Sequence, residues 1–188
     1  MKQGFVDFSL DDFSAFSDEK LVTVRKFFAN RTTVRVPTCP MALNGCYGGF
    51  SVSDELAVNL YVRMHGEPAA DRNSVVVHSI IYDKLGMRTD PILIDEILKI
   101  GLKASGGEFS RICLQQVPLD FENNITIHEY DGSETAGYNC QHSIRSLIND
   151  ASMSSSDLLQ RLIELDFLCL AFEVLGESKI TPRTDGYE

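Results

Sequence analysis

Residues 88–132, RTDPILIDEILKIGLKASGGEFSRICLQQVPLDFENNITIHEYDG, contain the pattern that decides the fold class. Asp90 and Pro91 are typical of a helix start, because an Asp side chain accepts hydrogen bonds from the first amides and Pro fits the first helical position. Apolar residues then recur at helical spacing as far as Leu102, and the glycine pair 106–107 supplies a stop. The pattern predicts one helix between Asp90 and the glycine pair.

Two strands are expected after this helix. Residues 109–117 are mostly apolar, and residues 124–130 alternate and end at an Asp-Gly turn. Because their connection is short, we expect these two strands to pair antiparallel with each other. Further strands are expected over residues 33–36 and 75–82. The predicted fold class is therefore α/β of the α+β kind: a small, mainly antiparallel sheet with packed helices, in a single domain.

The chain divides into three expected regions. Residues 1–16 are a Phe-rich N-terminal arm, packed either on the body of the protein or on a partner, because aromatic side chains bury much apolar surface. Residues 17–176 form the single domain, with helices after Ser17 and Ser53, a helix over residues 137–150 and an apolar helix over residues 158–174. Residues 177–188 are expected to be a flexible tail.

Composition excludes several classes of function. The 188 residues carry a net charge of −10, which argues against nucleic acid as the main ligand because a phosphate backbone is repelled. No apolar run reaches the ~18 residues of a membrane helix. Five scattered cysteines without a Cys-x-x-Cys pair, and no secretory signal, indicate reduced thiols. We therefore expect a cytoplasmic protein that binds neither nucleic acid nor membrane.

A glycine loop over residues 44–50, NGCYGGF, precedes the helix expected after Ser53. Backbone amides at such a place can hold an anion, which makes Tyr47, Gly48, Gly49 and Phe50 candidate ligand-binding residues. The loop has neither the Walker nor the dinucleotide-binding spacing. The alternative is a tight turn in which glycine is needed for a positive φ, with the aromatic side chains packed over it.

Three ionisable side chains are candidate catalytic residues. Glu129 and Asp131 lie two positions apart at a strand end, so they can face the same side and divide acid and base roles. The alternative is that both are solvated residues entering the turn. His142 lies eleven residues after Asp131, but the nearby cysteine does not complete a zinc site or a marked catalytic dyad.

Arg88 and Asp90 are further ligand-binding candidates, because a guanidinium at a helix start can hold a carboxylate or a phosphate. The alternative is local pairing of Arg88 with Asp90 or Asp95. No metal ion and no cofactor is expected, since no motif of either kind is present.

Three motifs in the same order resemble a viral protein family. They are Tyr47-Gly-Gly-Phe-Ser-Val-Ser-Asp, Arg88-Thr-Asp-Pro-Ile-Leu-Ile and Ile127-His-Glu-Tyr-Asp-Gly132. These stretches are similar to uncharacterised proteins of giant DNA viruses and some large bacteriophages, which carry YGGFxLS, RxDP and WxIxEYDG motifs. The chain also matches their LGxxAxG helix end, with Ile100 in place of Leu, and departs from the Trp region at residues 124–126.

The resemblance covers about residues 44–145 and implies a viral or phage origin, without bringing an activity. Two classes of function stay open. The first is a non-enzymatic viral accessory protein that binds a host or viral protein in the host cell cytoplasm. The second is a small enzyme, or a protein binding a small ligand or nucleotide, with a cluster made of Tyr47, Arg88, Glu129, Asp131 and His142. A homodimer through the helix over residues 158–174 is also expected, because its apolar residues exceed a single stripe. The alternative is that the Phe-rich N-terminal arm covers the remaining apolar surface within one chain.

Overall fold

The computed structural model describes residues 4–66, 88–119, 125–139, 144–145, 147–149 and 152–177. The elements in chain order are β1 (Gly4–Phe8), the 3-10 helix η1 (Leu10–Phe13), α1 (Asp18–Phe28), β2 (Val34–Asn44), α2 (Asp54–His65), α4 (Pro91–Ile100), α5 (Leu102–Ser105), β3 (Ile112–Pro118), β4 (Ile125–Tyr130), β5 (Ser133–Tyr138) and α7 (Ser155–Glu177). The chain is a single α+β domain with antiparallel sheets, which confirms the predicted fold class. The strand expected over residues 75–82, and the tail from residue 178 on, lie outside the described residues.

Strand β2 is the centre of the main sheet, whose order is β1-β2-β3 with antiparallel neighbours. Strands β4 and β5 form a separate hairpin. The prediction that the strands around residues 109–117 and 124–130 pair with each other was wrong. The hairpin turn consists of Asp131 and Gly132, with φ of 51° and 85°. Two positive φ values give a turn whose twist matches the strands, so β4 pairs with the strand that follows it directly.

The sequence had suggested that Pro37 and Pro40 end the strand, but β2 continues through both prolines. Pro37 lies where β2 pairs with β1, and Pro40 lies where it pairs with β3; only Thr38 has a register partner on both sides. A proline has no N–H for a ladder and is therefore tolerated where a strand has one open edge. Each proline is in such a segment, so β2 extends to Asn44 instead of ending at Val36.

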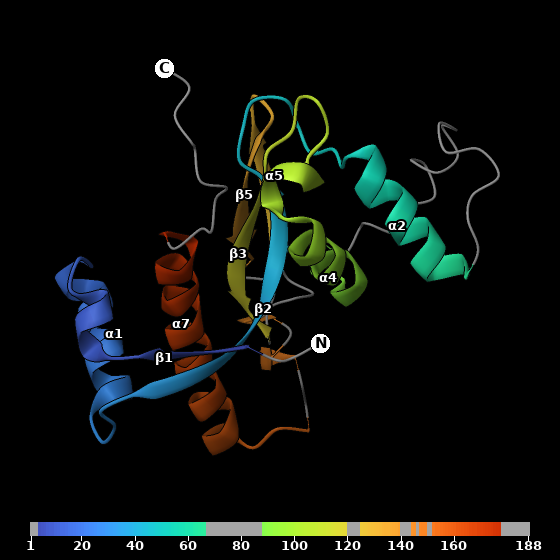
Figure 1. The fold of residues 1–188 in the computed structure, drawn as a ribbon. Coiled ribbons are helices and arrows are strands. Elements are labelled where there is room, and N and C mark those ends of the chain that lie inside the picture. Colours follow the sequence, from blue (N-terminus) through green and yellow to red (C-terminus); the bar gives the residue numbers. More distant parts are fainter. Residues whose placement is uncertain are drawn as a thin grey trace.

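Helices cover both faces of the strand pair β2–β3 (Figure 1): α2 and α4 lie on one side, α7 and α1 on the other. Successive residues of β2 point to opposite faces, and the packing follows this alternation. Ala42 packs with buried residues of α2 and α4, whereas Leu43 packs with Leu165 and Phe172 of α7. Val36, near the start of β2, belongs to a third group of buried residues with α1 and α7. One strand therefore contributes to all three parts of the core.

The N-terminal segment packs on the body of the protein. Strand β1 pairs with β2, and Phe8 and Phe13 are buried beside Phe167 of α7. Phe27 of α1 stacks on the same ring, with 4.1 Å between the ring centroids. The arm, α1 and the sheet thus cover much of the apolar surface of α7 that suggested a second subunit. The homodimer stays a prediction. The apolar surface of α7 that motivated it is largely covered within one chain.

Local helix signals were accurate at the starts of helices and less so at their ends. The Ser53 hydroxyl accepts from the amide of Leu56, which confirms the predicted start of α2. The helix expected to run to the glycine pair 106–107 ends instead at Gly101, whose φ is 93°. A glycine with a positive φ stops the helix one turn early, and α5 is a separate short turn. Gly137 and Tyr138, expected in a helix, belong to β5.

Truncating the aromatic side chain at the centre of this packing tests the arrangement. Phe167→Ala should lower the free energy of unfolding by about 3–5 kcal/mol, because a fully buried ring leaves a cavity among four other phenylalanine rings. Leu159→Ala on the same helix is the matched control, since Leu159 is 61% exposed and its loss should change stability by less than about 0.5 kcal/mol. Urea unfolding followed by circular dichroism measures both, and equal effects would contradict the packing described.

Candidate functional site

The glycine loop after β2 packs against two other segments. A Cβ on Gly48 would overlap the Phe109 carbonyl group, and a Cβ on Gly132 would overlap the backbone of Tyr47 and Gly49. Gly49 has a φ of 77°, whereas Gly48 does not have a positive φ. The expected turn with positive φ is therefore confirmed for Gly49 only. Gly48 is glycine for a different reason, namely the close approach of the chain around residue 109.

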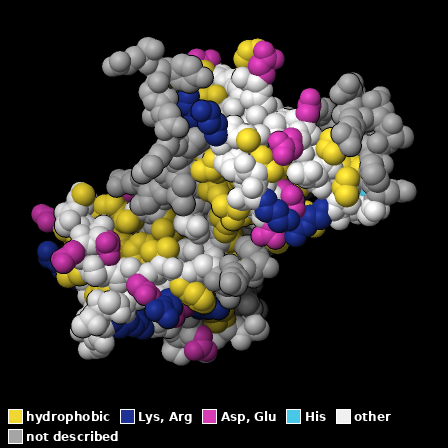
Figure 2. Space-filling view, in the orientation of Figure 1, with side chains coloured by type: hydrophobic (Ala, Val, Ile, Leu, Met, Phe, Trp, Pro, Cys, Tyr) yellow, Lys and Arg dark blue, Asp and Glu magenta, His cyan; other side chains and the backbone are white. Residues whose placement is uncertain are grey.

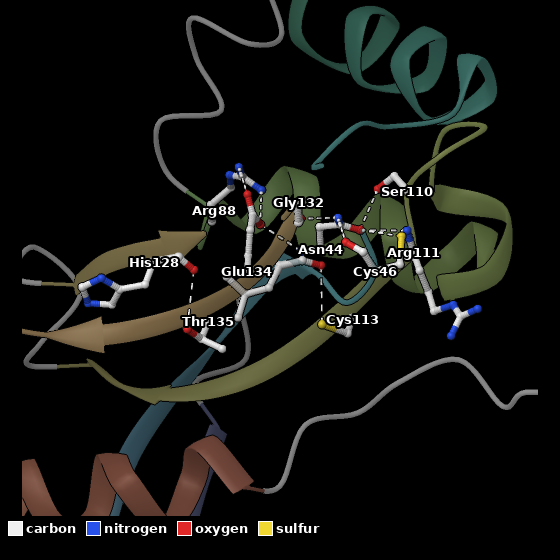
Figure 3. A network of polar contacts seen from close by, with 11 residues as sticks. Asn44, Cys46, Arg88, Ser110, Arg111, Cys113, His128, Gly132, Glu134 and Thr135 are labelled. Carbon is white, nitrogen blue, oxygen red and sulfur yellow. Dashed lines mark hydrogen bonds and ion pairs between the residues drawn. The ribbon is translucent and has the colours of Figure 1, made fainter. Parts of the chain in front are cut away.

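Asn44, the last residue of β2, joins the three segments through its side-chain amide, which is fully buried. Its Nδ2 donates to the carbonyl oxygens of Cys46 and Gly132, both at 2.6 Å. Its Oδ1 accepts from the Arg111 amide at 2.9 Å and from the Ser110 hydroxyl at 3.3 Å. Figure 3 shows the side chain between the three segments. Both donors and the acceptor of this buried amide are used, as burial of a polar group requires.

The carboxylate of Glu134 is the second buried group of the site. It accepts from the backbone amide of Asn44 at 2.8 Å and from the guanidinium of Arg88 at 3.0 and 3.3 Å. The guanidinium carbon lies 3.4 Å from the centroid of the Phe50 ring, so a cation–π contact adds to the ion pair. The Arg88 carbonyl also accepts from the amide of Ala42, which holds this segment at the open edge of β2. Arg88 is thus tied to the hairpin, not to Asp90 or Asp95.

The other candidate residues have more ordinary roles in this structure. Asp90 accepts from the amide of Ile92 at 2.7 Å and caps α4, as predicted for the helix start. Tyr47, Glu129 and Asp131 are exposed, and Asp131 occupies a turn position with positive φ. His142 lies outside the described residues. The structure therefore brings Tyr47 close to the hairpin turn and binds Arg88 to Glu134 of the same hairpin.

A separate charged group joins α2 to α4. Arg63 pairs with Asp95 at 3.2 Å and with Glu96 at 2.8 Å, and Lys99 pairs with Glu96 at 2.7 Å. The pKa of Arg63 is raised, first by its hydrogen bond to Asp95. Among the described residues, no group of three or more His, Cys, Asp or Glu side chains is placed to hold a metal ion. The described cysteines 39, 46, 113 and 169 are in the thiol form.

Asn44 and Glu134 were not singled out from the sequence. Asn44 was assigned to the glycine loop, where an Asn is ordinary turn chemistry, and Glu134 is one of several acidic residues near the hairpin. The available signal was the position of Glu134 two residues after an Asp-Gly turn, within an otherwise small and polar strand. That signal does not identify the residues that bind Glu134, because Arg88 and Asn44 are 46 and 90 positions away along the chain.

Comparison with known proteins does not extend these observations: no protein-family model, curated protein or solved structure matches the chain. In the part of the chain that the structure describes, no helix has both the length and the apolar character needed to cross a bilayer.

Neutralising Glu134 tests the buried ion pair. Glu134→Gln should lower the free energy of unfolding by about 2–3 kcal/mol, because the largely buried ion pair between Glu134 and Arg88 is lost. Glu129→Gln is the control, since Glu129 lies opposite Glu134 in the hairpin register but is exposed. Its effect should stay within about 0.5 kcal/mol. Similar melting temperatures for the two variants would contradict a structural role for the pair.

The two loop glycines should respond differently to substitution. At Gly49, Val should cost about 1–2 kcal/mol through strain at positive φ, and Asn should cost less because it tolerates the left-handed region. At Gly48, Asn should be as damaging as Val, since any Cβ meets the backbone at Phe109. Thermal unfolding of the four variants checks this, and recovery by Asn at Gly48 would contradict the close approach.

Proposed function

We propose that the protein is a non-enzymatic protein-binding module that docks through three aromatic side chains, Tyr47, Phe109 and Tyr130, here called the aromatic tip. The expectation that it acts as a viral accessory protein on a host or viral partner rests on the family resemblance. The proposal for its binding mode rests on the exposure of these side chains and on the way in which their backbone is held.

The exposure of the aromatic tip is the observation that supports the proposal. Tyr47, Phe109 and Tyr130 are 76%, 70% and 83% exposed. They come from three segments that meet at the end of the molecule where the β4–β5 hairpin turns (Figure 1). Aromatic side chains are enriched at protein interfaces and dominate their binding energy, because they bury a large area with few rotatable bonds.

The rigidity of the supporting backbone is the second part of the argument. The Asn44 amide bonds directly to two of the three segments at Gly132 and Arg111, and to its own loop at Cys46. A surface whose backbone is already ordered loses less conformational entropy on binding than a mobile loop does. The arrangement therefore suits recognition by a partner of matching shape.

The alternative is a small enzyme or ligand-binding protein that uses Tyr47, Arg88, Glu129, Asp131 and His142. It has weaker support, because Arg88 is engaged with Glu134 and Phe50, and Asp131 forms the hairpin turn. If the candidate residues lined a shared pocket, Arg88 and Asp131 would both have to contact the bound ligand from the positions that they occupy here.

Capture of the partner tests the proposal. Tagged protein with Tyr47→Ser, Phe109→Ser and Tyr130→Ser should retain less than about a tenth of the partner that the unchanged protein captures from host-cell extract, since losing about 1.4 kcal/mol already costs tenfold in affinity. Leu98→Ser with Leu159→Ser is the matched control, because both side chains are exposed but lie on α4 and α7. If the control variant lost the partner and the tip variant kept it, the result would contradict the proposal and show that the module docks through another surface.

A further inference from the structure

Two carboxylates lie beside the aromatic tip. Glu108 is next to Phe109 along the chain and Asp131 is next to Tyr130, and both are exposed. Within the described part of the chain, the side chains of Glu108 and Asp131 have no hydrogen bond or ion pair. Glu129 does not belong to this pair, because it lies opposite Glu134 in the register and therefore on the other face of the hairpin from Tyr130. Figure 2 shows acidic and hydrophobic side chains together at the upper end of the molecule, where Figure 1 places the hairpin turn, with a group of Lys or Arg side chains just below them.

The nearby basic side chains do not neutralise this group. Arg88 is engaged with Glu134 and Phe50. Arg111 contributes its backbone amide to Asn44, and its guanidinium extends away from the hairpin turn (Figure 3). The tip therefore combines aromatic faces with an excess of negative charge, on a chain whose net charge is −10.

The same combination of groups holds arginine elsewhere in this fold. Arg35 donates to both carboxylate oxygens of Asp7, and its guanidinium lies 5.8 Å from the centroid of the Phe5 ring. Arg88 repeats the pattern with Glu134 and Phe50. An aromatic face attracts the cation while a carboxylate accepts its N–H groups, and a guanidinium suits both at once.

We propose that the occupant of the aromatic tip is a basic, arginine-containing segment of a partner protein, an inference that rests on the proposed function. A neutral apolar occupant would remove water from the carboxylates without replacing its hydrogen bonds, which is costly. An acidic occupant would be repelled. An arginine-containing segment stacks its guanidinium groups on the tyrosine and phenylalanine rings and pairs with Glu108 and Asp131.

Peptide selection on the full chain tests the chemistry of the occupant without knowing the partner. Random 12-residue peptides displayed on phage are selected on the unchanged protein, and binders that also bind the Tyr47→Ser, Phe109→Ser, Tyr130→Ser variant are discarded. The remaining peptides should be enriched in arginine above the starting library. Replacing arginine by lysine in a selected peptide should weaken binding several-fold, because lysine lacks the planar donor fork.

A second variant separates charge from aromatic contact. Glu108→Gln with Asp131→Asn keeps the three rings, and Asn is acceptable at the positive φ of residue 131. Fluorescence anisotropy should show about tenfold weaker binding of a selected peptide to this variant, and a smaller dependence on salt. An unchanged melting temperature shows that the hairpin remains folded.

The outcomes distinguish this inference from the proposed function. Tip-dependent peptides that are apolar or acidic, and bind the neutralised variant equally well, would overturn the basic occupant while leaving the aromatic tip as a docking surface. A selection that yields no tip-dependent peptide would count against both. If a second copy of this chain were the occupant, the unchanged protein would associate with itself and the neutralised variant would not, which would overturn the separate partner.

Discussion

Hydrogen bonding by the buried side chain of Asn44 is the interaction that holds together the end of the protein where the β4–β5 hairpin turns. One amide group satisfies backbone groups from the glycine loop, from the segment before β3 and from the turn of the β4–β5 hairpin. A hydrophobic side chain of similar size would leave these N–H and C=O groups buried without partners, and each would then cost free energy. The three segments keep a common geometry because a single residue completes the hydrogen bonds of all three.

Glu134 continues this arrangement from the backbone of the same residue. Its carboxylate accepts from the Asn44 amide and binds Arg88, and Arg88 in turn covers Phe50 and bonds to the edge of β2. A carboxylate that is 4% exposed is stable only with such partners. The hairpin, the start of α4 and the central strand are thereby joined by one charged group, and this explains why the hairpin is held although β4 itself is largely exposed.

The core requires apolar burial, whereas the proposed docking surface requires exposed side chains on an ordered backbone. Strand β2 contributes to both. Its first half packs with the N-terminal arm, α1 and α7, and its second half lies between α7 on one face and α2 with α4 on the other. Apolar burial on both faces stabilises the strand, while its last residue provides the polar centre of the tip. Tyr47, Phe109 and Tyr130 can therefore remain exposed on an ordered support, which is the property that a docking surface needs.

The sequence by itself determined the features that depend on a few neighbouring residues. The helix starts at Ser53 and Asp90, the Asp-Gly turn and the left-handed Gly49 follow from local backbone chemistry, and all are present in the structure. Only the tertiary structure decided the pairing of β3 with β2, the path of β2 through two prolines, and the pairing of Arg88 with Glu134. The sequence left open whether the arm packs on the body or on a partner, and its packing on Phe167 was likewise decided by the whole fold. Capping and turn formation depend on atoms within one or two turns of the chain, whereas strand partners and buried ion pairs depend on which distant segments the collapsed core brings into contact.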